Sequence, residues 1–251
     1  MTSPTGKDLS AKLKSPPAAL TKNRLLKKLD GEELLSSLAK DLKKAAGTSA
    51  PELVGELTHP VSAYPLALLL RDAAIEAPVS KRIKKLDVTE ARLITGDLHV
   101  AGRLTVESTL VVLGNVEAQT VLVGEGGTLV VGGNLKACVA GGDGWLLVNG
   151  DLDADLVCCA YEAGELGVNG TLRALLAVSS NHGVRIVKNE ASNFFDLWDP
   201  SPKSKKYQEL LSRISPKAVL PEDEDADFGV LQVDFQRLMK LAQSGKPFLR
   251  G

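Results

Sequence analysis

One short phrase recurs five times in this chain, and it constrains the fold more than any other feature of the sequence. Each copy starts with glycine, continues with Asp, Asn or Thr, and then carries an apolar, a polar and a small apolar residue. Successive glycines lie 18, 19, 17 and 20 residues apart. A unit repeated at such a near-constant period is typical of a solenoid, in which each coil packs on its neighbours. The copies are Gly96–Val100, Gly114–Ala118, Gly133–Ala137, Gly150–Ala154 and Gly170–Ala174.

The residues between the glycines predict short strands. Runs such as Leu110–Leu113, Leu129–Val131 and Leu146–Val148 are rich in Leu and Val, too short for helices, and bounded by turn-forming residues. After each glycine, apolar and polar residues alternate, as in a strand with one buried face. We therefore expect a mainly β protein whose centre, residues 91–190, is a parallel β-helix (β-solenoid) of about five coils.

This segment resembles the parallel β-helix of the bactofilins, whose coils have a similar length and also consist of Val- and Leu-rich runs punctuated by glycine. It is also similar to a group of bacterial β-solenoid proteins with recurrent Gly-Asp-Leu-x-Ala/Val phrases, and the end of the chain, Leu241–Arg250, adds to that likeness. The bactofilin likeness covers residues 91–188 of the 251. It implies the β-helix fold and, as one functional possibility, assembly into a structural polymer.

The flanks of the repeat predict helices. Leucines recur at helical intervals between Thr21 and Ala46, and Gly31 either separates two helices or marks a weak point in one. Residues 1–20 are polar and end in Ser15-Pro16-Pro17, so they predict a disordered tail. Further helices are expected over residues 52–57, 65–77, 204–214 and 230–242. The expected domains are a disordered tail (1–20), a helical N-terminal region (21–88), the β-solenoid (91–190) and a C-terminal helical cap (191–251).

Charge and hydropathy exclude several classes of function. The formal charge is −1, which argues against a dedicated nucleic-acid-binding or membrane-surface protein. Residues 1–50 carry ten Lys or Arg and five Asp or Glu, either a contact site for an acidic partner or a solvated helix face. No aromatic residues interleave these lysines, so nucleic acid is not an expected partner. The longest apolar run outside the repeat, Ala63–Leu70, is too short to span a membrane. Met1–Leu20 has no apolar signal-peptide core, so a cytoplasmic location is expected.

Residues for catalysis or metal binding are not grouped in the sequence. The three histidines, His59, His99 and His182, are far apart and form no zinc-binding pattern. No phosphate-binding loop or serine nucleophile motif occurs. The adjacent Cys158 and Cys159 are either a redox site or two strand residues, one facing inward and one outward. We expect no catalytic, metal-binding or cofactor-binding residues and no cofactor.

Six residues are candidates for contact with a partner. The densest aromatic cluster contributes three of them, which either cover the exposed end of the last coil or anchor a partner. Trp145 lies in a strand, and two aspartates alternate on one face, where a ladder of surface charges with Lys136 and Arg173 is the alternative to catalysis. The six candidates are Phe194, Phe195, Trp198, Trp145, Asp151 and Asp153.

Taken together, these patterns favour a non-enzymatic cytoplasmic protein-binding module, such as an immunity or adaptor protein that neutralises or positions a partner protein. The alternative is a bactofilin-like structural protein that forms polymers, against which helical caps over both ends of the stack would argue. A third hypothesis is a sugar-active or metal-dependent β-helix enzyme. Assembly into a homo-oligomer stays open.

Overall fold

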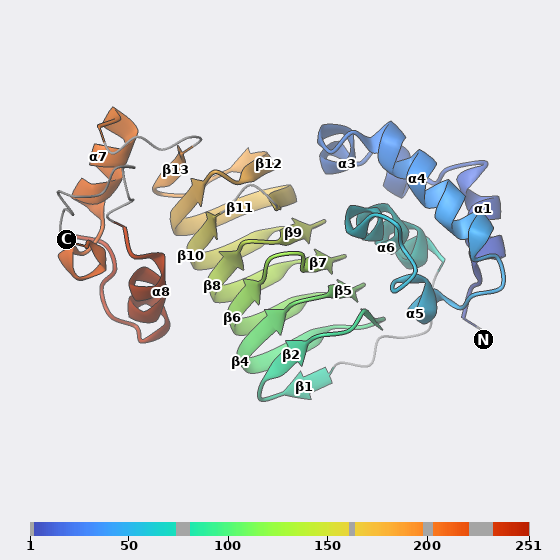
Figure 1. Ribbon diagram of the computed structural model, residues 1–251, viewed down its shortest axis with the longest axis horizontal. Coiled ribbons are helices and arrows are strands. Elements are labelled where there is room, and N and C mark those ends of the chain that lie inside the picture. The colour runs from blue at the N-terminus through green and yellow to red at the C-terminus, as the bar shows by residue number, and fades with distance from the viewer. Residues whose placement is uncertain (1–2, 74–80, 161–163, 198–202, 221–232, 251) are drawn as a thin grey trace.

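The repeat folds into a parallel β-solenoid of about six turns (Figure 1). The computed structural model describes residues 3–73, 81–160, 164–197, 203–220 and 233–250. Thirteen strands form one sheet system, and neighbouring strands pair in parallel. The strands are β1 Lys81–Ile83, β2 Leu86–Val88, β3 Arg92–Ile94, β4 Leu98–Val106, β5 Thr109–Val112, β6 Val116–Val123, β7 Thr128–Val131, β8 Leu135–Gly142, β9 Trp145–Val148, β10 Leu152–Ala160, β11 Glu165–Ser180, β12 Gly183–Asn189 and β13 Phe194–Leu197.

The stack extends beyond the expected residues 91–190 at both ends. It begins with β1 and β2, inside the stretch 21–88 that was expected to be helical, because residues 81–88 pair in register with β4. It ends with β13, which pairs with the last part of β11. The strands β1 and β2 lie in a basic run that lacks the recurring glycine phrase. The repeat phrase alone therefore predicted too short a solenoid.

Each coil has three flat faces. Residues equivalent to 98–100 form the first face, those equivalent to 104–106 the second, and those equivalent to 110–112 the third. Alternate residues point inward and form one continuous apolar core that runs the length of the stack. In the second coil these inward residues are Leu98, Val100, Leu104, Val106, Leu110 and Val112, all at most 2% exposed.

A ladder of Asp and Asn side chains joins the coils at the corner before the first face. Asp97 Oδ1 accepts a hydrogen bond from the backbone N–H of Asn115 at 2.7 Å, and Asn115 Oδ1 accepts one from Asn134 at 2.9 Å. Asn134 Oδ1 accepts a hydrogen bond from the backbone N–H of Asp151 at 2.9 Å, and Asp151 Oδ1 accepts one from the backbone N–H of Thr171 at 2.8 Å. Each side chain therefore bonds the next coil, which fixes the register of the stack as well as the local turn.

The glycine beside each ladder residue is required by the close approach of the coils. A Cβ atom on Gly150 would lie 2.7 Å from the backbone oxygen of Gly133, nearer than any real Cβ contact. Gly133 and Gly170 stand in the same crowded position relative to the preceding coil. The recurring phrase in the sequence thus records the corner at which coils touch.

The N-terminal helices cover the third face. The outward residues Val111, Val130 and Leu147 belong to the same buried apolar cluster as α6 and are completely shielded from solvent. Figure 1 shows α6 between the strands and the outer helices α1 and α4. The helices are α1 Gly6–Leu13, α2 Ala18–Thr21, α3 Arg24–Lys28, α4 Gly31–Lys44, α5 Ala50–Leu53 and α6 Ala63–Asp72, with a 3-10 turn at Pro60–Ser62. The first of the two alternatives at Gly31 is confirmed, since α3 ends at Lys28 and α4 begins at Gly31, with the break at Leu29 and Asp30.

The expected disordered tail over residues 1–20 is wrong for its described part. Helix α1 begins at a capping box in which Thr5 and Asp8 bond each other's backbone N–H groups. Leu9 and Leu20 are buried in the cluster that covers the third face. The polar composition of this segment predicted disorder, but its two buried leucines pack it into the core.

Polar contacts fix the N-terminal helices to the solenoid. Asn169 Oδ1 accepts hydrogen bonds from the backbone N–H groups of Arg24 and Leu25, at 3.0 and 2.9 Å. Asn23 Nδ2 donates to Asn149 Oδ1 at 2.9 Å, so the start of α3 is bound to two successive coils. The helical region and the solenoid are therefore one packed unit.

The C-terminal helices α7 (Lys205–Arg213) and α8 (Phe235–Gln243) cover the second face of the later coils. Outward residues such as Val139, Leu156 and Leu176 pack with Tyr207 and Leu238. The expected C-terminal helical region is confirmed, but it packs along the second face of these coils, which is apolar on its outer side, rather than over the end of the stack. None of the helices in the described part of the chain is long and apolar enough to span a membrane.

Candidate functional site

The first face carries a row of polar and charged side chains, whereas helices cover the third face and the second face of the later coils. Neighbouring residues of the row lie on adjacent coils, about 4.8 Å apart, and their charges alternate along the stack from Glu117 onward. All are exposed or half-buried. We call this row the charged face; it consists of Arg82, His99, Glu117, Lys136, Asp153, Arg173 and Glu190.

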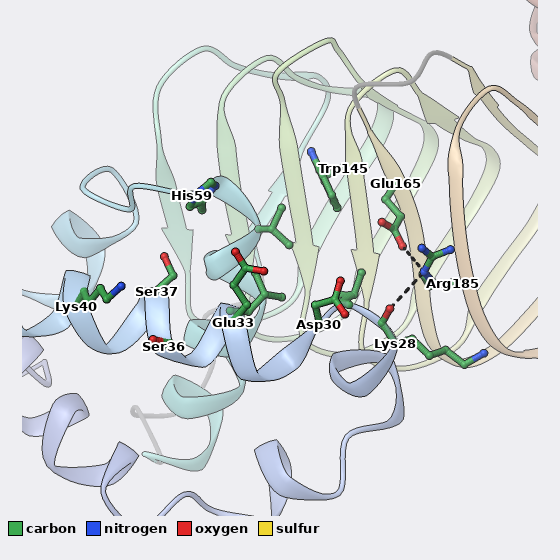
Figure 2. A pocket seen from close by; sticks show the side chains of 13 residues that line it. Lys28, Asp30, Glu33, Ser36, Ser37, Lys40, His59, Trp145, Glu165 and Arg185 are labelled. Atoms are coloured by element: carbon green, nitrogen blue, oxygen red, sulfur yellow. Dashed lines mark hydrogen bonds and ion pairs between the residues drawn. The ribbon is translucent and has the colours of Figure 1, made fainter.

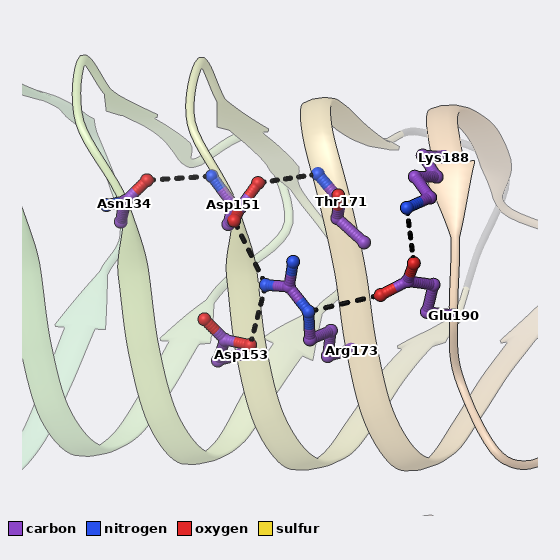
Figure 3. Close-up of polar contacts among 7 residues, drawn as sticks. All are labelled: Asn134, Asp151, Asp153, Thr171, Arg173, Lys188 and Glu190. Carbon is purple, nitrogen blue, oxygen red and sulfur yellow. Dashed lines mark hydrogen bonds and ion pairs between the residues drawn. The ribbon is translucent and has the colours of Figure 1, made fainter.

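Arg173 is the centre of a network on this face (Figure 3). One of its terminal nitrogens lies 3.0 Å from Asp151 Oδ2 and 3.2 Å from Asp153 Oδ1. Its Nε atom donates to Glu190 Oε2 at 3.2 Å, and Glu190 also pairs with Lys188. At the other end of the face, His99 Nε2 lies 3.2 Å from Glu117 Oε2. Polar groups on adjacent coils therefore pair at these two places, and the stack holds the pattern in place.

The network lowers the pKa of two of its carboxylates. The backbone N–H of Thr171 lowers the pKa of Asp151, and the Arg173 guanidinium lowers it further. The Lys188 ammonium lowers the pKa of Glu190, with a smaller contribution from Arg173. At neutral pH the charged face is a fixed pattern of positive and negative groups.

A shallow groove of about 360 Å³ runs beside the charged face. Lys136, Asp153 and Arg173 line one part of it, and Leu175 lies along it as well. Leu175 is 49% exposed and is the one large apolar side chain in the described part of the chain with this degree of exposure. The groove thus places an apolar side chain next to the alternating charges.

Leu175 was missed by the sequence reasoning, although a signal was present. By the register of the strands, it occupies the place taken by Cys138 and Asp155 in the two preceding coils. Cys138 is partly buried against α8, whereas Asp155 is exposed. A leucine at such a position is unusual for a solvated column.

The candidate residues chosen from the sequence are not brought together. Asp151 and Asp153 lie in the Arg173 network, where paired charges account for them without catalysis. Phe194 packs against the solenoid core and Phe195 is buried under the C-terminal helices, so neither side chain forms an exposed anchor. Trp198 lies outside the described residues. Trp145 points outward from the third face and lines a cavity beside α4.

The histidines and cysteines form no metal or redox centre among the described residues. No group of three or more His, Cys, Asp or Glu side chains in the described ranges has a geometry suited to a metal ion. Cys159 faces the solenoid core and Cys158 faces the C-terminal helices, the inward and outward placement that the strand interpretation predicts. Burial raises the pKa of Cys159 to about 12 and also raises that of Cys158.

Comparison of this chain with family models, with curated proteins and with solved structures found no match.

Proposed function

We propose that this protein is a non-enzymatic binding module that presents the charged face to a partner protein. The observation that carries the proposal is the difference between the three faces. The third face and the second face of the later coils are apolar on their outer side and are covered by the chain's own helices, whereas the first face is charged and exposed along the stack. A rigid, exposed pattern of alternating charges favours specific recognition, because a partner must match both the sign and the spacing of the charges.

Leu175 supplies the apolar contact that such a surface needs. Exposed ion pairs contribute little affinity by themselves, so a binding surface is stabilised mainly by buried apolar anchors. The groove beside the charged face offers this anchor next to Arg173 and Asp153. A partner that fits would present alternating charges around a small apolar pocket for Leu175.

The specific role we propose is that of an adaptor or immunity protein in the cytoplasm. The described cysteines are free thiols, which suits a reducing compartment. Steric blocking of a partner requires only a rigid surface, and the packed solenoid provides one.

The test is a quantitative co-purification from a lysate of the native host. The first variant combines Lys136→Glu with Leu175→Asp, which reverses one charge of the face and removes the anchor. The matched control is Lys43→Glu, on the exposed side of α4. We expect the same discrete partner with the wild type and the control, and its loss with the double variant. Equal recovery with all three proteins would contradict the proposal.

A second candidate function, end-to-end assembly as in the bactofilins that the repeat resembles, is favoured by the position of the helices. They pack along the sides of the stack rather than over its ends. Among the described residues, β1 and β2 pair only with β4, and β3 only with β5, so each has an open edge. Arg82 at one end and Glu190 at the other would continue the alternation of charges between stacked copies.

Head-to-tail contacts of this kind do not close and generate filaments. Light scattering and electron microscopy of the purified protein test this candidate. Filaments that disappear in Arg82→Glu would support it. A concentration-independent monomer would contradict it.

A further inference from the structure

A cavity of about 420 Å³ lies between α4 and the third face of the solenoid, away from the charged face (Figure 2). This volume is in the range of small-molecule sites. Trp145 from β9 and Glu165 from β11 form part of its solenoid wall. Asp30 and Glu33 lie on the helix side and face that wall (Figure 2). The cavity therefore combines an aromatic ring with several carboxylates.

Glu165 is largely buried and lacks a complete set of partners. Its side chain is 12% exposed, and its Oε1 atom lies 3.3 Å from Arg185 Nε but accepts no hydrogen bond within the described residues. The Arg185 Nε–H group is instead directed at the backbone oxygen of Lys28, also at 3.3 Å. Burial raises the pKa of Glu165; Arg185 opposes this effect, and the nearby Asp30 carboxylate adds to it. A further positive charge would relieve this repulsion.

Asp30 is held in a conformation that L-residues rarely adopt. Its φ and ψ angles are both 53°, in the left-handed region, and its side chain does not cap α4. Asp tolerates this region better than most residues, yet strained positions of this kind concentrate at binding sites. Neither Asp30 nor Glu33 uses its side chain in a hydrogen bond or ion pair within the described residues. Both carboxylates are thus available to a ligand.

The positive groups of the cavity are occupied or distant. Arg185 is engaged by Glu165 and Lys28, and the Lys28 ammonium donates to the backbone oxygen of Ile186 at 3.1 Å. Lys40 and His59 lie at the opposite end of the cavity from Glu165 (Figure 2). The end near Trp145 therefore favours a cation.

We propose that this cavity binds an organic ammonium group, held against the ring of Trp145 and paired with the carboxylates of Asp30 and Glu33. A cation over an indole ring and beside carboxylates is stabilised by both interactions. The ammonium group belongs either to a free aliphatic amine or to a lysine side chain of a partner protein. The site is independent of the charged face.

Titration calorimetry and tryptophan fluorescence test the proposal. The chain has two tryptophans, so Trp198→Phe serves as the background in which fluorescence reports Trp145. The probes are cadaverine, the diol of the same chain length as a neutral control, and Nα-acetyl-lysine methylamide. Tighter binding of cadaverine would identify a free amine, and equal or tighter binding of the lysine derivative would identify a protein side chain.

Two conservative variants remove the charges that the proposal uses. Asp30→Asn keeps a residue that tolerates the left-handed region, and Glu33→Gln keeps the size of the side chain. Each is expected to weaken cadaverine binding about two- to fivefold, the effect of losing one exposed charge pair. The matched control Glu32→Gln, also exposed on α4 but outside this cavity, should bind as the wild type does. Absence of cadaverine binding, equal binding of the diol, or unchanged affinity in both variants would overturn the proposal.

Discussion

Leu25 of α3 packs against Gly167 of the solenoid, where a side chain on the glycine would collide with it. A Cβ atom on Gly167 would lie 3.0 Å from one methyl carbon of Leu25 and 2.7 Å from one of Leu147. In the two preceding coils the same column carries Val130 and Leu147. Because Gly167 has no side chain, Leu25 of α3 can pack at this place in the column.

This contact predicts a measurable coupling between the two sites. Leu25→Ala should destabilise the protein by about 2–4 kcal/mol, the usual cost of a buried Leu-to-Ala cavity. Gly167→Val should also destabilise it, because the new side chain collides with Leu25. Urea unfolding of the double variant should show less than the sum of the two losses, since the valine then occupies the space left by Leu25. Strict additivity would show that these residues do not share one space.

The close approach at the glycine corner predicts a strong difference between two Gly-to-Ala variants. Gly150→Ala places a Cβ atom against the backbone of the preceding coil and is expected to lower the free energy of unfolding by about 2 kcal/mol or more. Gly47→Ala is the control, because a Cβ atom there meets no atom within 4 Å. Thermal unfolding compares them. Equal stability of the two variants would show that the corner has room for a side chain.

The Asx ladder predicts that the acceptor atom, and not the residue type, matters at Asn134. Asn134→Ala removes the acceptor for the Asp151 N–H group and should cost about 1 kcal/mol, the net value of a typical hydrogen bond. Asn134→Asp keeps an oxygen in the same place and should retain most of the stability. Denaturant unfolding of both variants decides this, and an Asp variant as unstable as the Ala variant would count against the ladder.

The lowered pKa of Asp151 predicts a loss of stability in acid. A carboxyl whose folded pKa is depressed contributes stability above its unfolded pKa of about 4, and this contribution is lost as the pH falls through the folded pKa. Asp151→Asn keeps the oxygen that binds the Thr171 N–H group but cannot titrate. The melting temperature of this variant should therefore fall less steeply than that of the wild type below about pH 4. Identical pH profiles would exclude a contribution from Asp151.

The fold could be predicted from the sequence because the solenoid is encoded locally. The runs at Leu110, Leu129 and Leu146 correspond to β5, β7 and β9, and the recurring glycines stand where coils touch. The sequence also contained evidence that the third face is covered. A run without alternation, such as Leu110–Leu113, is typical of a strand buried on both sides, and Val111 is indeed covered by helices.

The surfaces could not be predicted to the same degree. The cavity at Trp145 exists because α4 packs at a distance from the solenoid, which depends on contacts between residues far apart in the sequence. The sequence left open whether Phe194 and Phe195 cover the last coil or anchor a partner, and in the structure Phe194 packs against the solenoid core while Phe195 lies under the C-terminal helices. Leu175 could be identified as a contact residue only from the strand register, which places it in line with Cys138 and Asp155.

The measurement that tests the binding proposal most directly is the affinity of the purified protein for the isolated partner, as wild type and as Lys136→Glu. Lys136 stands between Glu117 and Asp153 in the register of the charged face, so the substitution places three negative groups in a row. The proposal predicts at least about tenfold weaker binding, with the difference shrinking at high salt as exposed charges are screened. Equal dissociation constants for the two proteins at low salt would contradict it.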